Sequence, residues 1–188
     1  MSEVRPTLYC AAISGSLRSG SSNTRLLDTA ARCAPSHLRI ERYRAVGDLP
    51  HFNPDNAPRD FPVVEQFIEM MRRADGVIVS TPEYAGGLPG TFKNALDWLV
   101  GSDAFVRKPF MLLKASSRAL RAQLATVEIL TTMSGVEISD ASATIPLLGQ
   151  NLDVLEILWR PDYVTAIQAS LARFAAGIRV MRHQSKVN

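Results

Sequence analysis

The sequence predicts an α/β fold in which helices cover both faces of a parallel sheet. Apolar runs of strand length alternate with amphipathic or Ala/Leu-rich runs of helix length, which is the pattern of βαβ units. Two of the apolar runs are almost purely hydrophobic, as central parallel strands covered on both faces should be. These observations predict a three-layer sandwich around a five-stranded parallel sheet of order 2-1-3-4-5.

The strands are predicted from apolar runs bounded by turn residues. Strands 3 and 4 carry the purest hydrophobic runs and therefore belong in the centre of the sheet. The five predicted strands are about Thr7–Ile13, Arg39–Tyr43, Gly76–Ser80, Pro109–Lys114 and Glu137–Ala143.

The helices are predicted between these strands, and Gly or Pro residues mark most of their flanks. A last helix is expected to begin near Asp162, which can cap its N-terminus, and it carries one apolar stripe as far as Met181. The segment Gly47–Asp60 is a long loop containing Pro and Asn, and loops of this length are often functional. The other predicted helices are Asn23–Cys33, Pro62–Arg73, Thr91–Val100 and Leu120–Ser134.

Length and composition predict one domain over residues 1–188, with the 46% hydrophobic and 21% charged residues of an ordinary globular protein. The net charge of +3 comes from Lys and Arg scattered among acids, so we expect no nucleic-acid or membrane partner. No apolar run approaches the length of a membrane span, and we expect a cytoplasmic protein. Cys10 and Cys33 are expected to be separate reduced thiols.

A small, hydroxyl-rich loop follows strand 1 and runs into a helix. Such a loop aims backbone N–H groups and the helix dipole at one point, which suits an anion. Ser16, Ser21, Ser22 and Asn23 add polar groups, and Arg18 can add a charge-assisted hydrogen bond. The glycine and lysine spacings match no dinucleotide or triphosphate loop, so a terminal monophosphate fits better. The alternative is an ordinary loop whose Ser and Asn residues only cap the helix.

A second loop follows strand 3, which would lie beside strand 1 in this sheet order. Pro82 fixes the turn, Gly86 and Gly87 let the backbone approach a flat ligand, and Tyr84 can border an aromatic ring. Glu83 can equally be a solvated turn acid. Further along, Asn94, Asp97 and Trp98 are expected to serve in packing or in a subunit interface.

Three segments in order resemble motifs of the NADPH-dependent FMN reductase family, the flavodoxin-like group that includes chromate and quinone reductases. Gly15–Asn23 is similar to its Gly-Ser-Leu-Arg-x-x-Ser-x-Asn phosphate motif. Thr81–Trp98 is similar to its Pro-Glu-Tyr … Pro-Gly-x-x-Lys-Asn-x-x-Asp-Trp motif, and Leu49–Asp55 to its Leu-Pro-x-Phe-Asn-x-Asp loop. The resemblance implies a flavodoxin-like fold.

The resemblance also implies which residues bind FMN. The third flavin-side loop of the family is often Ala-Ser-Pro-Gly with further glycines, whereas Lys114–Leu120 lacks the proline and glycines. Its Ser116, Ser117 and Arg118 can therefore meet FMN, the nicotinamide or neither, and we assign Ser116 to the cofactor site. Ala85 replaces an asparagine common in the family. The predicted cofactor-binding residues are Ser16, Arg18, Ser21, Ser22, Asn23, Pro82, Glu83, Tyr84, Ala85, Gly86, Gly87 and Ser116.

The implied function is an NAD(P)H oxidoreductase that passes two electrons from NADPH or NADH through FMN to a small acceptor. A quinone, a flavin, an azo compound or a metal oxyanion can fill that role, and the family resemblance implies a homodimer or homotetramer. We predict no metal site and no catalytic side chain, because His37, His51 and His183 lie far apart without partner spacing.

Two alternatives to an enzyme stay open. A non-enzymatic FMN-binding electron carrier or regulatory module would fit the altered third loop, although electron carriers of this fold usually have acidic surfaces and this chain is basic. A nucleic-acid-binding regulatory module rests only on the sequence pI of about 9.1.

Overall fold

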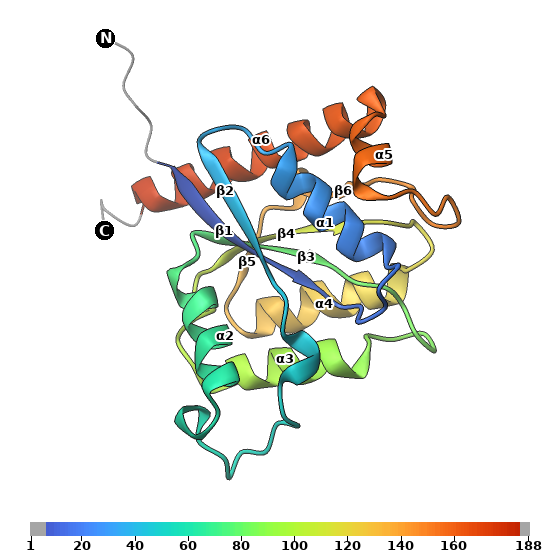
Figure 1. Cartoon of the computed structure of the whole chain (residues 1–188). Coiled ribbons are helices and arrows are strands. Elements are labelled where there is room, and N and C mark those ends of the chain that lie inside the picture. The colour runs from blue at the N-terminus through green and yellow to red at the C-terminus, as the bar shows by residue number, and fades with distance from the viewer. Residues whose placement is uncertain (1–6, 185–188) are drawn as a thin grey trace.

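The chain folds around a parallel sheet whose strands lie in the predicted order (Figure 1). The computed structural model describes residues 7–184. Every pairing in the sheet is parallel, and the order is β2-β1-β3-β4-β5. The strands are β1 (Leu8–Ser14), β2 (Leu38–Tyr43), β3 (Gly76–Ser80), β4 (Pro109–Lys114), β5 (Val136–Glu137) and β6 (Ala143–Thr144).

Helices cover both faces of the sheet, as the alternating pattern predicts (Figure 1). The helices are α1 (Ser22–Arg32), α2 (Pro62–Arg73), α3 (Gly90–Val100), α4 (Leu120–Thr132), α5 (Val154–Leu158) and α6 (Pro161–Gln184). On one face lie α1, α5 and α6, and on the other lie α2, α3 and α4. Within residues 7–184, no helix combines the length and the apolar character needed to cross a membrane.

Two hydrophobic cores form because successive side chains of a strand point to opposite faces of the sheet. In β1, Ala11 and Ile13 join the core under α2 and α3, whereas Cys10 and Ala12 join the core under α1 and α6. β3 is buried along its whole length, Gly76–Ser80, which explains its almost continuous apolar sequence.

The fifth strand differs from its prediction, because Glu137–Ala143 is not one continuous strand. β5 ends at Glu137, a 3₁₀ turn forms at Ser139–Ala141, and β6 then pairs with the end of β4. The turn takes its residues out of the ladder, and the hydroxyl of Ser142 accepts the hydrogen bond from Leu112 N at 3.0 Å. A side chain thus replaces the backbone in the ladder, and the sheet gains a sixth short strand.

The structure also adds a short helix, α5, that the sequence analysis missed. Asp153 caps it by accepting a hydrogen bond from Glu156 N at 2.8 Å, while the Glu156 side chain accepts one from Asp153 N at 2.7 Å. This reciprocal capping box was visible in the sequence as Asp-x-x-Glu. The last helix begins at Pro161, so Asp162 lies inside its first turn and not at its cap.

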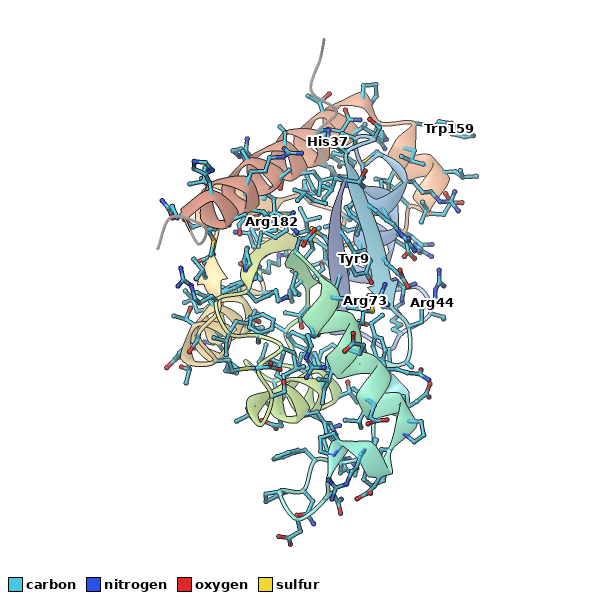
Figure 2. All side chains as sticks on the ribbon, turned by 90° about the vertical axis from the view of Figure 1, so that its left-hand side faces the viewer. Tyr9, His37, Arg44, Arg73, Trp159 and Arg182 are labelled. Carbon is cyan, nitrogen blue, oxygen red and sulfur yellow. The ribbon has the colours of Figure 1, made fainter. Side chains whose placement is uncertain are left out.

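At the amino end of the sheet, the Asp75 carboxylate joins β1 to α6. Asp75 Oδ2 accepts a hydrogen bond from Tyr9 N at 2.8 Å, and Asp75 N donates to Tyr9 O at 2.6 Å. Arg182, near the end of α6, forms an ion pair with Asp75 (both Tyr9 and Arg182 are labelled in Figure 2). Cys10 is fully buried beside this group, and burial together with the Asp75 charge raises the pKa of its thiol from 9.0 to about 12.

The Cys10 thiol predicts a loss of stability at alkaline pH. A folded-state pKa above the unfolded value favours the folded state fully below pH 9, and this contribution disappears as the pH rises through about 12. We expect the free energy of unfolding, measured by urea titration from pH 8 upward, to fall more steeply for wild type than for Cys10→Ala. The control is Cys33→Ala, which removes a half-buried thiol and should change the slope less. Equal slopes for wild type and Cys10→Ala would contradict the prediction.

Candidate functional site

The loops after β1 and β3 lie side by side at the carboxyl edge of the sheet. Ser14 and Ser80 are register partners, and Gly15 N donates to Ser80 O at 2.9 Å just beyond them. A Cβ atom added at Gly15 would lie 2.2 Å from Thr81 Oγ1 and 2.7 Å from Thr81 Cβ. Glycine is therefore required here by the close approach of the second loop, which brings both predicted motifs to one place.

The first loop is held by its own serines. Ser21 caps α1, because its Oγ accepts a hydrogen bond from Thr24 N at 3.3 Å. Ser16 is buried, and its Oγ accepts a hydrogen bond from Arg18 N at 3.3 Å. Ser21 therefore does cap the helix, as the alternative reading of this loop expected. The first residues of α1, Ser22 and Asn23, still line the pocket beside the loop.

The second loop contains a tight turn at Tyr84–Gly87. Tyr84 N donates to Gly87 O and Gly87 N donates to Tyr84 O, each at 3.0 Å. The two central residues both have positive φ angles, 50° at Ala85 and 76° at Gly86. This is the geometry of a type I′ turn, which favours Asn or Gly at both central positions. Ala85 is therefore held in a strained backbone conformation.

Glu83 ties this turn to helix α4. Its Oε2 accepts a hydrogen bond from Ala122 N at 3.1 Å, so the carboxylate binds a backbone donor in the first turn of the helix. A Cβ atom added at Gly86 would lie 3.2 Å from Arg121 Nη1, so the Arg121 guanidinium lies over the turn. Glu83 thus links the Tyr84 turn to helix α4 and is not only a solvated acid.

The third loop, after β4, is ordered by a serine. Ser116 Oγ accepts a hydrogen bond from Arg118 N at 3.0 Å, and Gln123 Nε2 donates to Ser116 O at 3.0 Å. The N-cap position of α4 is Ala119, which has no side chain that can cap, and within residues 7–184 Glu83 alone supplies a side-chain acceptor to the first turn through Ala122 N. The loop holds its shape without the proline and glycines that the family often has there.

These three loops enclose a pocket of about 320 Å³ at the carboxyl edge of the sheet. Asn23 lines it, and its Oδ1 accepts a hydrogen bond from Ser80 Oγ at 3.0 Å. Nine of the predicted residues line the pocket, namely Ser16, Arg18, Ser21, Ser22, Asn23, Pro82, Glu83, Tyr84 and Ser116. The predicted residues Ala85, Gly86 and Gly87 complete the turn but lie outside the lining.

Six lining residues were not among the predicted site residues, and they are Gly20, Thr81, Ala115, Arg118, Ala119 and Leu148. Most of them are neighbours of predicted residues, so their proximity in sequence was a usable signal. Leu148 is different, because it follows β6 and reaches the pocket only through the tertiary fold.

The Lys-Asn-x-x-Asp-Trp segment of α3 holds the long loop before α2. Asn94 Oδ1 accepts a hydrogen bond from Phe52 N at 2.7 Å, and Asn94 Nδ2 donates to Pro50 O at 3.0 Å. Trp98 Nε1 also donates to Pro50 O, at 2.8 Å, and the Phe52 ring meets the Trp98 ring edge-on at 5.2 Å. Trp98 is 2% exposed. Asn94 and Trp98 were expected to serve either in packing or in a subunit interface. In the structure, both residues pack within the chain.

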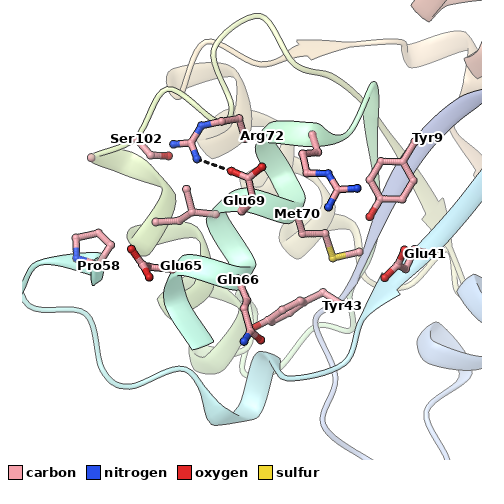
Figure 3. Close-up of a pocket in the computed structure, with 13 residues that line it drawn as sticks. Tyr9, Glu41, Tyr43, Pro58, Glu65, Gln66, Glu69, Met70, Arg72 and Ser102 are labelled. Atoms are coloured by element: carbon pink, nitrogen blue, oxygen red, sulfur yellow. Dashed lines mark hydrogen bonds and ion pairs between the residues drawn. The ribbon is translucent and has the colours of Figure 1, made fainter. Parts of the chain in front are cut away.

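A larger hollow of about 800 Å³ lies at the other side of the molecule, between β2 and α2 (Figure 3). Side chains of both signs line it, and the Arg72 guanidinium pairs with Glu69 at 2.9 Å within it. Tyr9 also borders it, with the Arg73 guanidinium 6.0 Å from its ring. It is remote from the carboxyl ends of β1 and β3, where ligands of open α/β sheets bind. The smaller pocket is therefore the candidate site.

The model of the NADPH-dependent FMN reductase family matches residues 9–147. This span holds all of β1 except Leu8, strands β2 to β6, and the three loops after β1, β3 and β4. The chain belongs to the NADPH-dependent FMN reductase family. Membership confirms the family resemblance and agrees with the flavodoxin-like sheet order.

Relatives of this family member include named reductases. The chain is 40% identical over 87 residues to a quinone reductase of Escherichia coli (strain K12), a match that covers 45% of this chain and 46% of that protein. It is 40% identical over 108 residues to an NAD(P)H-dependent FMN reductase of Pseudomonas aeruginosa, covering 56% of this chain and 58% of that protein. The chain thus spans about half the length of these curated relatives.

The fold is also similar to a solved flavoenzyme. The NAD(P)H:acceptor oxidoreductase FerB of Paracoccus denitrificans superposes with a TM-score of 0.78 at 25% identity, over 92% of this chain and 98% of that one. An NADH:FMN oxidoreductase in its apo form has a TM-score of 0.65 at 22% identity, over 91% and 90% of the two chains, and this likeness concerns the fold.

The positive φ angle at Ala85 predicts that Ala85→Asn stabilises the protein. Asparagine tolerates the left-handed conformation that alanine resists, so we expect the free energy of unfolding to rise by about 1 kcal/mol. Urea titration measures this change. The control Ala172→Asn places the same substitution on an exposed position of α6, where asparagine is a poorer helix former and should be slightly destabilising. Destabilisation by both variants would contradict the turn assignment.

Proposed function

We propose that the chain is an FMN-dependent NAD(P)H oxidoreductase that reduces a small acceptor. The observation that carries the proposal is the convergence of two separate family motifs on one pocket, in front of the N-terminus of α1. Family membership supports the same chemistry. Within the proposal, Ser16–Asn23 holds the phosphate of FMN and Pro82–Tyr84 borders its ring.

The phosphate end of the proposed site offers donors of three kinds. The uncapped backbone N–H groups of the first turn of α1 face the pocket, and a helix N-terminus attracts an anion. Arg18 adds a guanidinium that has no ion pair with the acids of residues 7–184. Asn23 Oδ1 accepts the hydrogen bond from Ser80 Oγ, so the Asn23 Nδ2 amide is the group left to donate to a phosphate oxygen. This donor set suits a terminal phosphate.

The ring end of the proposed site combines flat, small and aromatic surfaces. Pro82 and Ala115 present little bulk, so a planar ring can approach the backbone of both loops. Tyr84 is exposed and can border the ring on the solvent side. The link from Glu83 to Ala122 fixes the turn relative to α4, so the loops that meet the ring keep their separation.

Bound FMN would supply the two-electron transfer between the nicotinamide and the acceptor. The residues of the chain would bind the cofactor, orient it and leave one side of the pocket open to solvent. We assign no acid or base role to a side chain, and a quinone, flavin, azo compound or metal oxyanion can serve as acceptor. NADPH or NADH serves as co-substrate.

We further propose that the chain assembles as a homodimer or homotetramer. Exposed apolar side chains lie at the pocket or in the segments that follow β1 and β4, and their burial would be favourable. These side chains are Leu17, Tyr84, Leu120, Leu124 and Leu148. Light scattering on the eluting peak of a sizing column measures the assembly directly, and a monomer at micromolar concentration would overturn this part of the proposal.

The central experiment mixes the purified protein with FMN and then with NADPH and a quinone. We expect the flavin fluorescence to be quenched on binding, and the nicotinamide absorbance to fall only when FMN-loaded protein is present. Tight FMN binding without NAD(P)H oxidation would favour the electron-carrier alternative. Absence of FMN binding would overturn the proposed function.

Arg18→Ala tests the phosphate assignment. Loss of a charge-assisted hydrogen bond should weaken FMN binding by about 1.5–3 kcal/mol, as measured by fluorescence titration. Arg59→Ala is the matched control, because Arg59 lies in the exposed 3₁₀ turn before α2, and the same loss of charge there should leave FMN affinity unchanged. An Arg18→Ala protein with wild-type affinity for FMN would show that the phosphate binds elsewhere.

A further inference from the structure

Three arginines gather around the pocket from different segments of the chain. Arg18, in the loop after β1, and Arg118, in the loop after β4, line the pocket, and Arg121, in the first turn of α4, lies beside it at Gly86 of the Tyr84 turn. None of the three takes part in an ion pair within residues 7–184. The described arginines that form ion pairs are Arg39, Arg42, Arg72 and Arg182, and all four lie outside this pocket.

The pocket has little negative charge to balance these arginines. Glu83 is the one acidic residue among the described residues that line it, and its carboxylate already accepts the hydrogen bond from Ala122 N. The two lining guanidinium groups, of Arg18 and Arg118, against one carboxylate leave a positive excess, and Arg121 adds a third cation beside the Tyr84 turn. An excess of this kind attracts a ligand with more than one anionic group.

Arg118 and Arg121 lie on the ring side of the pocket and not at its phosphate end. Arg118 lines the pocket with its neighbours Ala115 and Ser116, and Arg121 lies over Gly86 in the Tyr84 turn. The proposed phosphate end, by contrast, is built from the loop after β1. The FMN phosphate therefore accounts for Arg18 and leaves the other two without an anion.

We propose that Arg118 and Arg121 bind a phosphate group of the nicotinamide dinucleotide. This inference rests on the proposed function, in which the nicotinamide must reach the open side of the ring that these arginines flank. The dinucleotide carries a pyrophosphate, and NADPH carries a 2′-phosphate as well. Guanidinium groups match phosphate oxygens in a two-pronged geometry and stay charged at every physiological pH.

The sequence of the third loop fits this role. Where the family often has proline and glycines, this chain has Ser116-Ser117-Arg118-Ala119, and the Ser116 hydroxyl fixes Arg118 N. A serine-stabilised turn thus replaces a glycine turn and adds a cation at the pocket wall. In this proposal, the replacement of proline and glycines by Ser116-Ser117-Arg118-Ala119 lets the loop bind a phosphate of the coenzyme, while the Ser116 hydrogen bond keeps the loop ordered.

The test measures coenzyme binding and turnover for Arg118→Ala, Arg121→Ala and the double variant, each loaded with FMN. Calorimetry with NADP⁺ and NAD⁺ gives Kd, and steady-state assays with a quinone give KM for NADPH and NADH. We expect Kd and KM for NADPH to rise about 10-fold for a single variant, the effect of one lost charge-assisted bond. FMN affinity should stay at the wild-type value.

The two coenzymes distinguish which phosphate is bound. A loss confined to NADPH and NADP⁺ would assign the arginines to the 2′-phosphate, whereas equal losses for both coenzymes would assign them to the pyrophosphate. Arg118→Lys keeps the charge without the two-pronged geometry and should recover part of the affinity. Arg59→Ala is again the charge-matched control and should bind both coenzymes as wild type does.

Three results would overturn the inference. They are coenzyme affinities unchanged in the double variant, an equal loss of FMN affinity, and a rise in the KM of the quinone in place of the coenzyme. Each of these results is read against a wild-type protein that binds FMN and oxidises NAD(P)H. Such a result would therefore overturn the coenzyme-binding role of the arginines and leave the proposed function standing. A wild type that binds no FMN would overturn both.

Discussion

The close approach of the chain at Gly15 and Thr81 is the constraint on which the pocket depends. β1 and β3 are parallel neighbours, so both loops leave the sheet at the same edge. The bond from Gly15 N to Ser80 O extends the ladder one residue beyond the strands and leaves no room for a side chain at Gly15. The hydroxyl-rich loop and the Pro-Glu-Tyr loop therefore become two walls of one pocket.

Several polar side chains of the site form hydrogen bonds that hold its loops in place. Ser21 caps α1, Glu83 joins the Tyr84 turn to α4, and Ser116 orders the loop after β4. Asn94 and Trp98 act at a distance, by fixing the loop before α2. A planar cofactor needs such loops at a constant separation, since its reactive atoms can be positioned only by groups that are themselves held.

Some arginines of the described chain have an acidic partner, and those at the pocket do not. On α2 Arg72 pairs with Glu69, and at the amino edge of the sheet Arg182 pairs with Asp75. At the pocket, Arg18 and Arg118 stand without acidic partners among the described residues. The modest net charge of +3 hides this difference, because composition averages over the surface while a ligand meets only one part of it.

The sequence by itself determined the strand order and the two motif loops. β3 and β4 were predicted to the residue, because strands buried on both faces have unbroken apolar runs. Of the twelve predicted site residues, nine line one pocket, since motif residues adjacent in sequence stay adjacent in space. Ala85 shows the limit of the pattern, because its positive φ angle becomes visible only in the folded turn.

Only the tertiary structure decided the features that depend on contacts between distant segments. The fifth strand is interrupted by the 3₁₀ turn at Ser139–Ala141, after which the Ser142 hydroxyl accepts the hydrogen bond from Leu112 N, a pairing 30 residues apart that leaves no periodic signal. Leu148 joins the pocket, and Arg121 reaches Gly86, for the same reason. Local sequence determines on which face of a strand or helix a residue lies and which turn it favours. Which other segment meets that face is set by packing of the whole sheet and its helices.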